Sequence, residues 1–163
     1  MTLRPRSATS LLIVVGWVSL VASQPQPASA AQRSLWDGVY TTEQADRGKI
    51  LYGQYCASCH MPDLMGNPDV PPGQPPTARG FRGFAGGSPP LRGGQFISNW
   101  TGLTLKNLFE RIRVSMPQSA PGSLSRQRNA DILAFILAES AYPSGRQELP
   151  SVDAPLDDIW IMP

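Results

Sequence analysis

The chain has few of the side chains from which catalytic and metal sites are commonly built, with one histidine and two cysteines in 163 residues. Acid–base catalysis by histidine would have to use that single residue. A structural zinc site needs four ligands, and the histidine and cysteines together supply only three. A catalytic, metal or cofactor site built from histidine and cysteine must therefore use this one histidine and these two cysteines.

The chain also lacks a basic excess. Its formal net charge is +2, and Arg4 and Arg6 lie in an N-terminal segment that we expect to be removed. The remaining 12 basic residues then match the 12 acidic ones. Because phosphate binding requires a concentrated positive surface, we expect no nucleic acid partner.

A long apolar run is absent as well. The longest, Leu11 to Val21, falls short of the roughly 20 residues that cross a bilayer. Preceded by Arg4 and Arg6 and followed by Ala28-Ser29-Ala30, it is typical of an export signal. We therefore expect residues 1–30 to be a signal peptide cleaved after Ala30, a periplasmic location, and no stable membrane insertion.

Proline and glycine are abundant, with 17 and 15 residues. They dominate residues 61–94 and prevent regular helix there, which predicts a long loop. Apolar spacing and capping residues predict helices over 41–56, 104–114 and 126–141. No segment alternates as a strand of a sheet would, so the predicted fold class is all-α.

The predicted helices define the domain organisation. Residues 41–143 form the expected domain, and residues 31–40 precede it as a short extended N-terminal extension. Residues 144–163 are predicted to be an irregular C-terminal tail. At the start of the domain, Thr41 and Gln44 have the spacing of a capping box.

Both cysteines and the only histidine of the chain lie in one motif, Cys56-Ala57-Ser58-Cys59-His60. The spacing suits covalent haem attachment, in which two thiols bond to vinyl groups of the porphyrin and the next residue ligates iron. The motif predicts one haem c per chain, with its iron bound by His60. No histidine then remains for catalysis, and we expect that the protein is not an enzyme.

Three other uses of the motif compete with haem. A disulfide between Cys56 and Cys59 is common in exported proteins but leaves the adjacent histidine unexplained. A thioredoxin-like redox pair would follow a strand, whereas here the motif ends a predicted helix. Zinc lacks its fourth ligand. The sequence favours haem over all three.

A sixth iron ligand can be sought among the five methionines. Met1 belongs to the signal peptide, Met61 and Met65 follow His60 too closely to reach the other side of the iron, and Met162 lies in the predicted tail. Met116 remains, after the second helix and before Pro117. It is the candidate sixth ligand; the alternative is a methionine that fills the core.

The sequence over about residues 41–142 resembles that of class I c-type cytochromes with one haem. The resemblance implies a cytochrome c fold, three to four helices wrapped around one covalently bound haem. It implies that Gly48 and Tyr52 cross the last helix at Ile132 and Phe135. It also implies that the carbonyl of Pro90 accepts the proton on the outer nitrogen of the histidine.

Part of the chain is similar to periplasmic cytochromes associated with quinoprotein dehydrogenases. This similarity implies an electron carrier that accepts electrons from such a dehydrogenase and passes them to a downstream cytochrome or oxidase. Trp100 is interpreted as haem-pocket packing, with its N–H toward a propionate. Two departures stand out: Met61 occupies a position where relatives have glycine, and residues 67–88 look like an insertion.

Two rival functions remain open at this point. In one, the sixth position is labile and the protein senses a gas or handles peroxide. In the other, the chain is a relay subunit fixed permanently to a larger dehydrogenase. The response to carbon monoxide separates the first rival from an electron carrier, and co-purification with a larger protein identifies the second.

Overall fold

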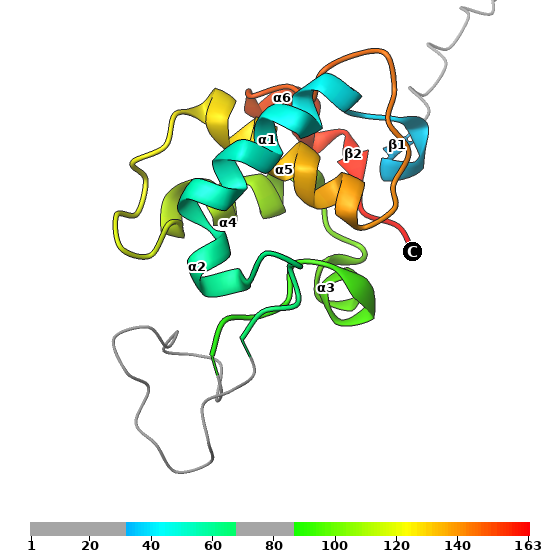
Figure 1. Ribbon diagram of the computed structural model, residues 1–163. Coiled ribbons are helices and arrows are strands. Elements are labelled where there is room, and N and C mark those ends of the chain that lie inside the picture. The colour runs from blue at the N-terminus through cyan, green and yellow to red at the C-terminus, as the bar shows by residue number, and fades with distance from the viewer. Residues whose placement is uncertain (1–31, 68–86) are drawn as a thin grey trace, which may run out of the picture. The chain divides into compact units, whose positions relative to one another are not determined.

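The computed structural model describes residues 32–67 and 87–163, which all lie in one compact unit, Ala31–Pro163 (Figure 1). Within these residues the chain is mostly helical, with two strands of two residues each and one short 3-10 helix. The elements in chain order are β1 (Arg33–Ser34), η1 (Leu35–Asp37), α1 (Thr42–Tyr55), α2 (Ala57–His60), α3 (Gly93–Trp100), α4 (Leu105–Ser115), α5 (Arg126–Glu139), α6 (Asp153–Asp157) and β2 (Ile159–Trp160).

The three predicted helices are confirmed as α1, α4 and α5, with boundaries that differ by at most two residues. Their start signals act as expected: the Thr41 and Ser125 hydroxyls accept from the backbone N–H of Gln44 and Arg128. Three further helices, α2, α3 and α6, were not predicted from periodicity. α2 is a single turn, and α3 begins at Gly93-Gly94, which are poor helix formers.

The crossing of α1 and α5 depends on one glycine. A Cβ atom at Gly48 would lie 1.8 Å from the backbone oxygen of Asp131 and 3.0 Å from Cβ of Phe135. One turn later, the rings of Tyr52 and Phe135 pack with centroids 5.2 Å apart. The predicted contact of Gly48 and Tyr52 with this helix is confirmed, although the atoms nearest Gly48 belong to Asp131 and Phe135 rather than Ile132.

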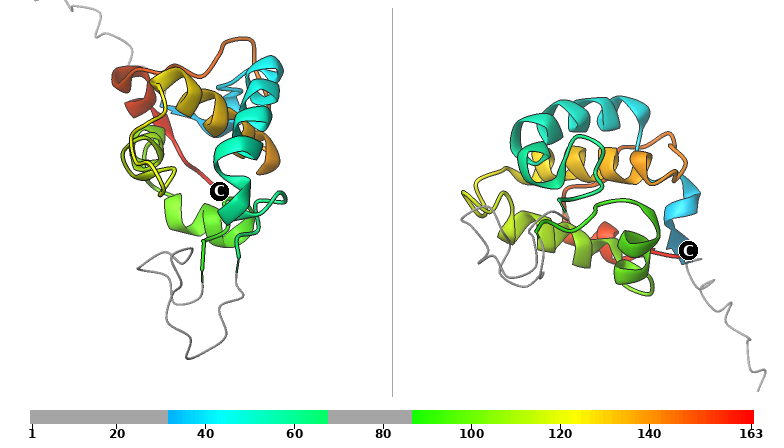
Figure 2. Two further views of the ribbon diagram at one scale, coloured as in Figure 1. Left: turned by 60° about the vertical axis from the view of Figure 1, so that its left-hand side comes forward. Right: turned by 60° about the horizontal axis from the view of Figure 1, so that its bottom comes forward.

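Helix α5 is the centre of the core. Residues 129–137 are all buried, so the helix is covered on every side. It packs against both α1 and α4, which lie on different sides of it in both views of Figure 2. This arrangement fixes the directions in which the ends of α1 and α4 point, and those ends carry the residues of the candidate site.

The predicted irregular tail is wrong for much of residues 144–163, which contain α6 and β2. β2 pairs in parallel with β1, with Arg33 opposite Ile159 and Ser34 opposite Trp160, so the expected absence of a sheet is also wrong. The two strands are too short for an alternating pattern to be visible in the sequence. Apolar burial explains the order, because four side chains of the tail are 0–2% exposed and each contributes roughly 1.5–3 kcal/mol. They are Leu149, Leu156, Ile159 and Ile161.

The predicted capping box at α1 forms only in part. Thr41 caps the helix, but the Gln44 side chain turns away and pairs with the backbone of Leu149 in both directions. Its Nε2 donates to the Leu149 carbonyl at 3.1 Å, and its Oε1 accepts from the Leu149 N–H at 2.6 Å. A buried amide with two backbone partners is worth more than a surface cap. Gln44 therefore anchors the beginning of the tail.

Two expectations concern residues outside the described part of the chain: the signal peptide over 1–30 and most of the insertion over 67–88. The ends of the second segment are described. The Asn67 N–H donates to the Ser88 carbonyl at 3.1 Å, and the Leu91 N–H donates to the Leu64 carbonyl at 2.8 Å. Among the described helices, none has the length and apolar character needed to cross a membrane.

Candidate functional site

The two cysteines and the histidine lie around a single helical turn. α1 ends at Tyr55, Cys56 separates it from α2, and the N–H groups of Cys59 and His60 both donate to the Cys56 carbonyl, at 3.1 and 2.9 Å. This turn brings Cys56, Cys59 and His60 together at one end of α1. Both cysteines are free and half-buried.

The imidazole of His60 is buried and oriented by a backbone carbonyl. Its side chain is 7% exposed, and Nδ1 lies 2.8 Å from the carbonyl oxygen of Pro89. A carbonyl only accepts, so Nδ1 carries the proton and Nε2 keeps its lone pair. Burial lowers the pKa of His60, an effect that the hydrogen bond to Pro89 opposes. The ring is therefore neutral, and its Nε2 could bind a metal ion.

The expected role of Pro90 is wrong by one residue, because the acceptor is Pro89. The two prolines are adjacent, and neither composition nor spacing reveals which carbonyl faces the ring. The surrounding backbone determines which of the two proline carbonyls faces the His60 ring. A Cβ atom on Gly66 would lie 2.3 Å from the Ser88 oxygen and under 3 Å from the backbone of Pro89 and Pro90, so the two segments are in close contact.

A second hydrogen bond fixes the chain directly after His60. The Tyr52 hydroxyl donates to the Met61 carbonyl at 2.7 Å, and the Gly66 N–H donates to the His60 carbonyl at 3.1 Å. Burial raises the pKa of Tyr52, which keeps the phenol protonated as a donor. The sequence placed Tyr52 at the helix crossing but gave no sign of this second role. The carbonyls of His60 and Met61 are therefore both fixed by hydrogen bonds.

Met61, the residue found where relatives have glycine, adopts a backbone conformation that suits glycine better. Its φ is 62° and its ψ is 154°. A side chain in this region is strained by roughly 1–3 kcal/mol. The hydrogen bonds of the neighbouring residues offset this strain and keep the chain on the same path.

The thiol of Cys56 is not in the state that a redox-active pair would need. Burial, with a smaller contribution from Cys59, raises the pKa of Cys56 to about 12, whereas reactive dithiols have a lowered pKa. No group of three or more Cys, His, Asp and Glu side chains that could hold a metal ion occurs among the described residues. The raised pKa of Cys56 thus agrees with the preference for haem over a thioredoxin-like pair.

Met116 lies directly after α4, where its N–H closes the last turn by donating to the Ile112 carbonyl at 2.9 Å. Its side chain is half-buried. Of the other described methionines, Met65 and Met162 are about half exposed, at 50% and 48%. Met61 is also half-buried and directly follows α2, but it is adjacent to His60 in the chain, so Met116 remains the candidate.

The residues present fit a haem. Two thiols and a neutral imidazole with a free Nε2 lie on one turn, which is the donor set for two thioether bonds and one iron ligand. Several apolar side chains on the following segments pack against the core but stay partly exposed, and they could cover an apolar ring system. They are Leu91, Ile97, Trp100 and Ile112. Trp100 is the last residue of α3 and is half-buried, as packing beside a cofactor would require.

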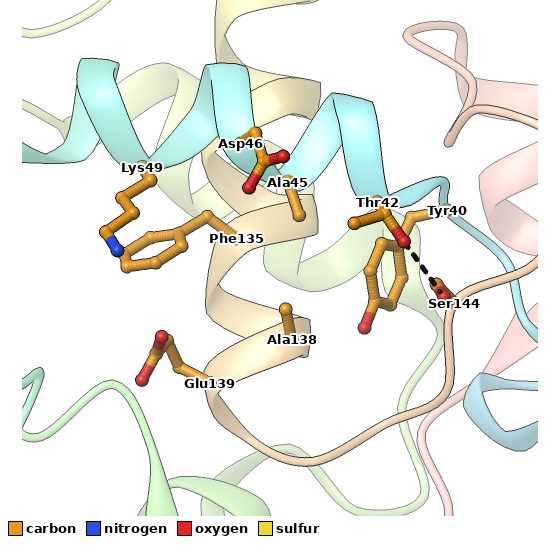
Figure 3. Close-up of a pocket in the computed structure, with 9 residues that line it drawn as sticks. All are labelled: Tyr40, Thr42, Ala45, Asp46, Lys49, Phe135, Ala138, Glu139 and Ser144. Atoms are coloured by element: carbon orange, nitrogen blue, oxygen red, sulfur yellow. Dashed lines mark hydrogen bonds between the residues drawn. The ribbon is translucent and has the colours of Figure 1, made fainter.

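A separate surface pocket of about 190 Å³ lies between α1 and α5. Figure 3 shows its lining, which includes Lys49, Phe135 and Glu139, and the hydrogen bond between Thr42 and Ser144 at 3.2 Å. Pockets for organic ligands usually measure about 300–1,000 Å³. None of the predicted site residues lines this pocket, so it is not the candidate site.

Comparison with known proteins bears on the same part of the chain. Residues 43–136, more than half of the sequence, match the family model described as cytochrome c oxidase, cbb3-type, subunit III. None of the curated proteins and none of the solved structures compared with the chain gives a significant match. The matched range contains α1 except its first residue, α2 to α4 and most of α5, together with the Cys-x-x-Cys-His turn and Met116.

Proposed function

This chain belongs to the cytochrome c family described as cytochrome c oxidase, cbb3-type, subunit III, and on that premise we propose that it carries electrons through a single haem c. Membership implies haem-based electron transfer and a c-type haem with iron. The finer proposal is that Cys56 and Cys59 hold the haem covalently, with His60 and Met116 as axial ligands.

The observation that carries the proposal is the orientation of His60. A ring fixed through Nδ1 presents Nε2 in one direction and stays neutral, as an iron ligand must. The carbonyl of Pro89 also makes the imidazole more basic and thereby a stronger donor to iron. A buried histidine that served only the core would not need two free cysteines on the same turn.

When bound, the haem supplies a reversible one-electron iron couple. The protein's part is to hold both axial ligands so that the two oxidation states differ little in geometry. A thioether from Met116 opposite the histidine would raise the reduction potential. Electrons would enter and leave beside Cys56 and Cys59, since both residues are half-buried rather than enclosed. We propose no reaction catalysed by the protein itself.

We further propose a periplasmic location and a quinoprotein or similar dehydrogenase as donor, with a downstream cytochrome or oxidase as acceptor. The export-like N-terminus and the resemblance to cytochromes of such dehydrogenases support this. Stopped-flow mixing of the oxidised protein with a reduced quinoprotein dehydrogenase tests the donor. Reduction within the dehydrogenase turnover time supports the proposal, and reduction far slower than turnover contradicts it.

A labile sixth ligand is the second candidate, and one observation favours it. Residues 118–123, which follow Met116 and Pro117, are all exposed, so little packing holds the chain after the methionine. If Met116 leaves the iron readily, a gas or peroxide could bind there. The reduced protein would then bind carbon monoxide, which a carrier with a firmly held methionine does not.

Covalent attachment is tested by mass spectrometry of the protein made in a haem-maturing host. The proposal expects a mass increase of one haem that survives denaturation. In Cys56→Ala and Cys59→Ala a single remaining thioether is expected, with a reduced yield of holoprotein, while Ser58→Ala, on the same turn, should keep full attachment. Loss of the haem from the unaltered protein on denaturation would contradict the assignment.

A further inference from the structure

The C-terminal part of the chain is hydrogen-bonded to α4, the helix that ends directly before Met116. Residues 149–161, here called the C-terminal strap, run from the Gln44 anchor through α6 and β2. The strap meets the N-terminal end of α4 and the loop before it. Figure 1 shows the red β2 beside the blue β1, the strand with which it pairs.

The first fastening of the strap to α4 is at Asp157. Its carboxylate accepts from the Thr104 hydroxyl at 3.0 Å and from the Lys106 ammonium at 3.0 Å. Thr104 precedes α4 and Lys106 lies in its first turn. One carboxylate thus connects α6 to the beginning of α4.

The second fastening is a pair of backbone hydrogen bonds. The Ile161 N–H donates to the Leu103 carbonyl at 2.9 Å, and the Gly102 N–H donates to the Ile161 carbonyl at 3.0 Å. Trp160 also forms an antiparallel bridge with Thr104. The loop between α3 and α4 is therefore bonded to the end of the strap, and its position depends on it.

The third fastening is Arg126, the first residue of α5. Its guanidinium donates to the Ser151 carbonyl and to Asp153 in the strap, and to Glu110 in α4 at 3.3 Å. The same guanidinium lies 4.9 Å from the centre of the buried Phe109 ring. Arg126 joins the strap, α4 and α5 at one point.

These fastenings matter because the opposite end of α4 has little support. After Met116 the chain runs through exposed residues 118–123, and the next buried residue is Leu124. The position of Met116 is therefore set by α4 itself. α4 is held by α5 on its buried face and by the strap at its beginning and middle.

We propose that the C-terminal strap positions Met116, and that Asp157 and Arg126 are positioning residues which keep α4 in the register that presents the thioether to the iron. The inference rests on the proposed function, since it takes Met116 as the sixth ligand. It assigns to the tail a role in ligand affinity, beyond its role in stability.

The test compares variants of the haem-containing full chain in their affinity for imidazole, which competes with Met116 for ferric iron. Asp157→Ala removes both acceptors at the start of α4, and Leu156→Ala removes a fully buried side chain of α6. The matched control is Arg47→Ala, which breaks ion pairs with Asp131 of α5 and with Glu148, the residue before the strap, and leaves the contacts of the strap with α4 intact. Thermal unfolding is measured for each.

The proposal expects both strap variants to bind imidazole about three- to ten-fold more tightly than the unaltered protein, whereas Arg47→Ala stays within about two-fold at a similar loss of thermal stability. Asp157→Asn, which keeps an acceptor for Thr104, should lie between the two. If the strap variants unfold earlier but bind imidazole like the unaltered protein, the strap serves stability alone and the proposal is overturned.

Met116→Ala in the same series separates the two levels of the argument. A large gain in imidazole affinity in Met116→Ala with none in the strap variants would overturn the strap proposal and leave the sixth ligand in place. No change in Met116→Ala would overturn the sixth-ligand assignment and the strap's role together. Asp157→Ala decides the question even if Leu156→Ala does not fold.

Discussion

The two sides of the candidate site differ in how firmly the chain holds them. The histidine side comprises residues 52–66 with Pro89, and the methionine side comprises residues 105–123. On the first, a buried ring and three hydrogen bonds fix His60 and its neighbours. On the second, Met116 is half-buried and leads into an exposed segment. The comparison indicates that nearby residues hold the proposed histidine ligand, while the position of the proposed methionine ligand depends on parts of the chain that are distant in sequence.

The largest expected effect comes from breaking the helix crossing beneath the histidine side. Gly48→Ala puts a Cβ atom 1.8 Å from a backbone oxygen, so α1 must move away from α5. We expect a loss of about 2–3 kcal/mol in the free energy of unfolding, measured by denaturant titration. Gly53→Ala is the control, because nothing lies within 4 Å of its Cβ, and it should gain roughly 0.5–1 kcal/mol. Equal effects of the two would refute the close-packing argument.

Removing one hydrogen bond from the histidine side should cost less. Tyr52→Phe keeps the ring against Phe135 but leaves the Met61 carbonyl without its phenol donor. A loss of about 1–2 kcal/mol in thermal unfolding is expected. Tyr55→Phe, in the last turn of the same helix, should change stability by less. If Tyr52→Phe proves neutral, the phenol does not anchor this segment.

Relieving the backbone strain at Met61 should make the histidine side more stable. Met61→Gly removes a side chain from a positive-φ residue, and we expect a gain of up to about 1 kcal/mol. Met65→Gly is the control, because that residue is not at positive φ and glycine there should cost roughly 0.5–1 kcal/mol. A loss of stability in Met61→Gly would mean that the methionine side chain contributes more than its backbone costs.

The smallest expected effect concerns pH and the methionine side. The guanidinium of Arg113, together with that of Arg126, lowers the pKa of Glu110 below its ordinary value of 4.5. A lowered carboxyl pKa contributes stability that is present above the ordinary value and is lost as the pH falls through the folded-state value. Glu110→Gln should therefore be less stable at pH 7, by under about 1 kcal/mol, and equal to the unaltered protein well below pH 4. A difference that persists unchanged in acid would point to a cause other than ionisation.

The family resemblance predicted the crossing at Gly48. Local signals were enough to predict α1, α4 and α5 and to single out the turn with the Cys-x-x-Cys-His motif. They depend on periodicity, capping residues and one compact motif, all of which are visible over a few positions. The acceptor of the His60 proton and the second role of Tyr52 could not be predicted, because both depend on which backbone carbonyl faces a side chain. Gln44 shows the same limit. Its spacing from Thr41 indicated a capping box, but its side chain bonds instead to the backbone of Leu149, 105 residues away.

The order of the C-terminal tail was missed for a related reason. Its strand is two residues long, and α6 is only five, so neither produces a period. What orders the tail is the burial of scattered apolar residues such as Leu156 and Ile159 on surfaces formed by other elements. Such surfaces exist only after folding. The sequence shows the apolar residues without showing what they cover.

The most direct test of the account is an absorption spectrum of the purified haem protein, taken oxidised, reduced, and reduced with carbon monoxide, beside Met116→Ala and the control Met65→Ala. We expect a low-spin c-type spectrum that carbon monoxide does not change, and a weak long-wavelength ferric band that disappears only in Met116→Ala. A high-spin spectrum that shifts with carbon monoxide in the unaltered protein would contradict the account and support an open sixth position.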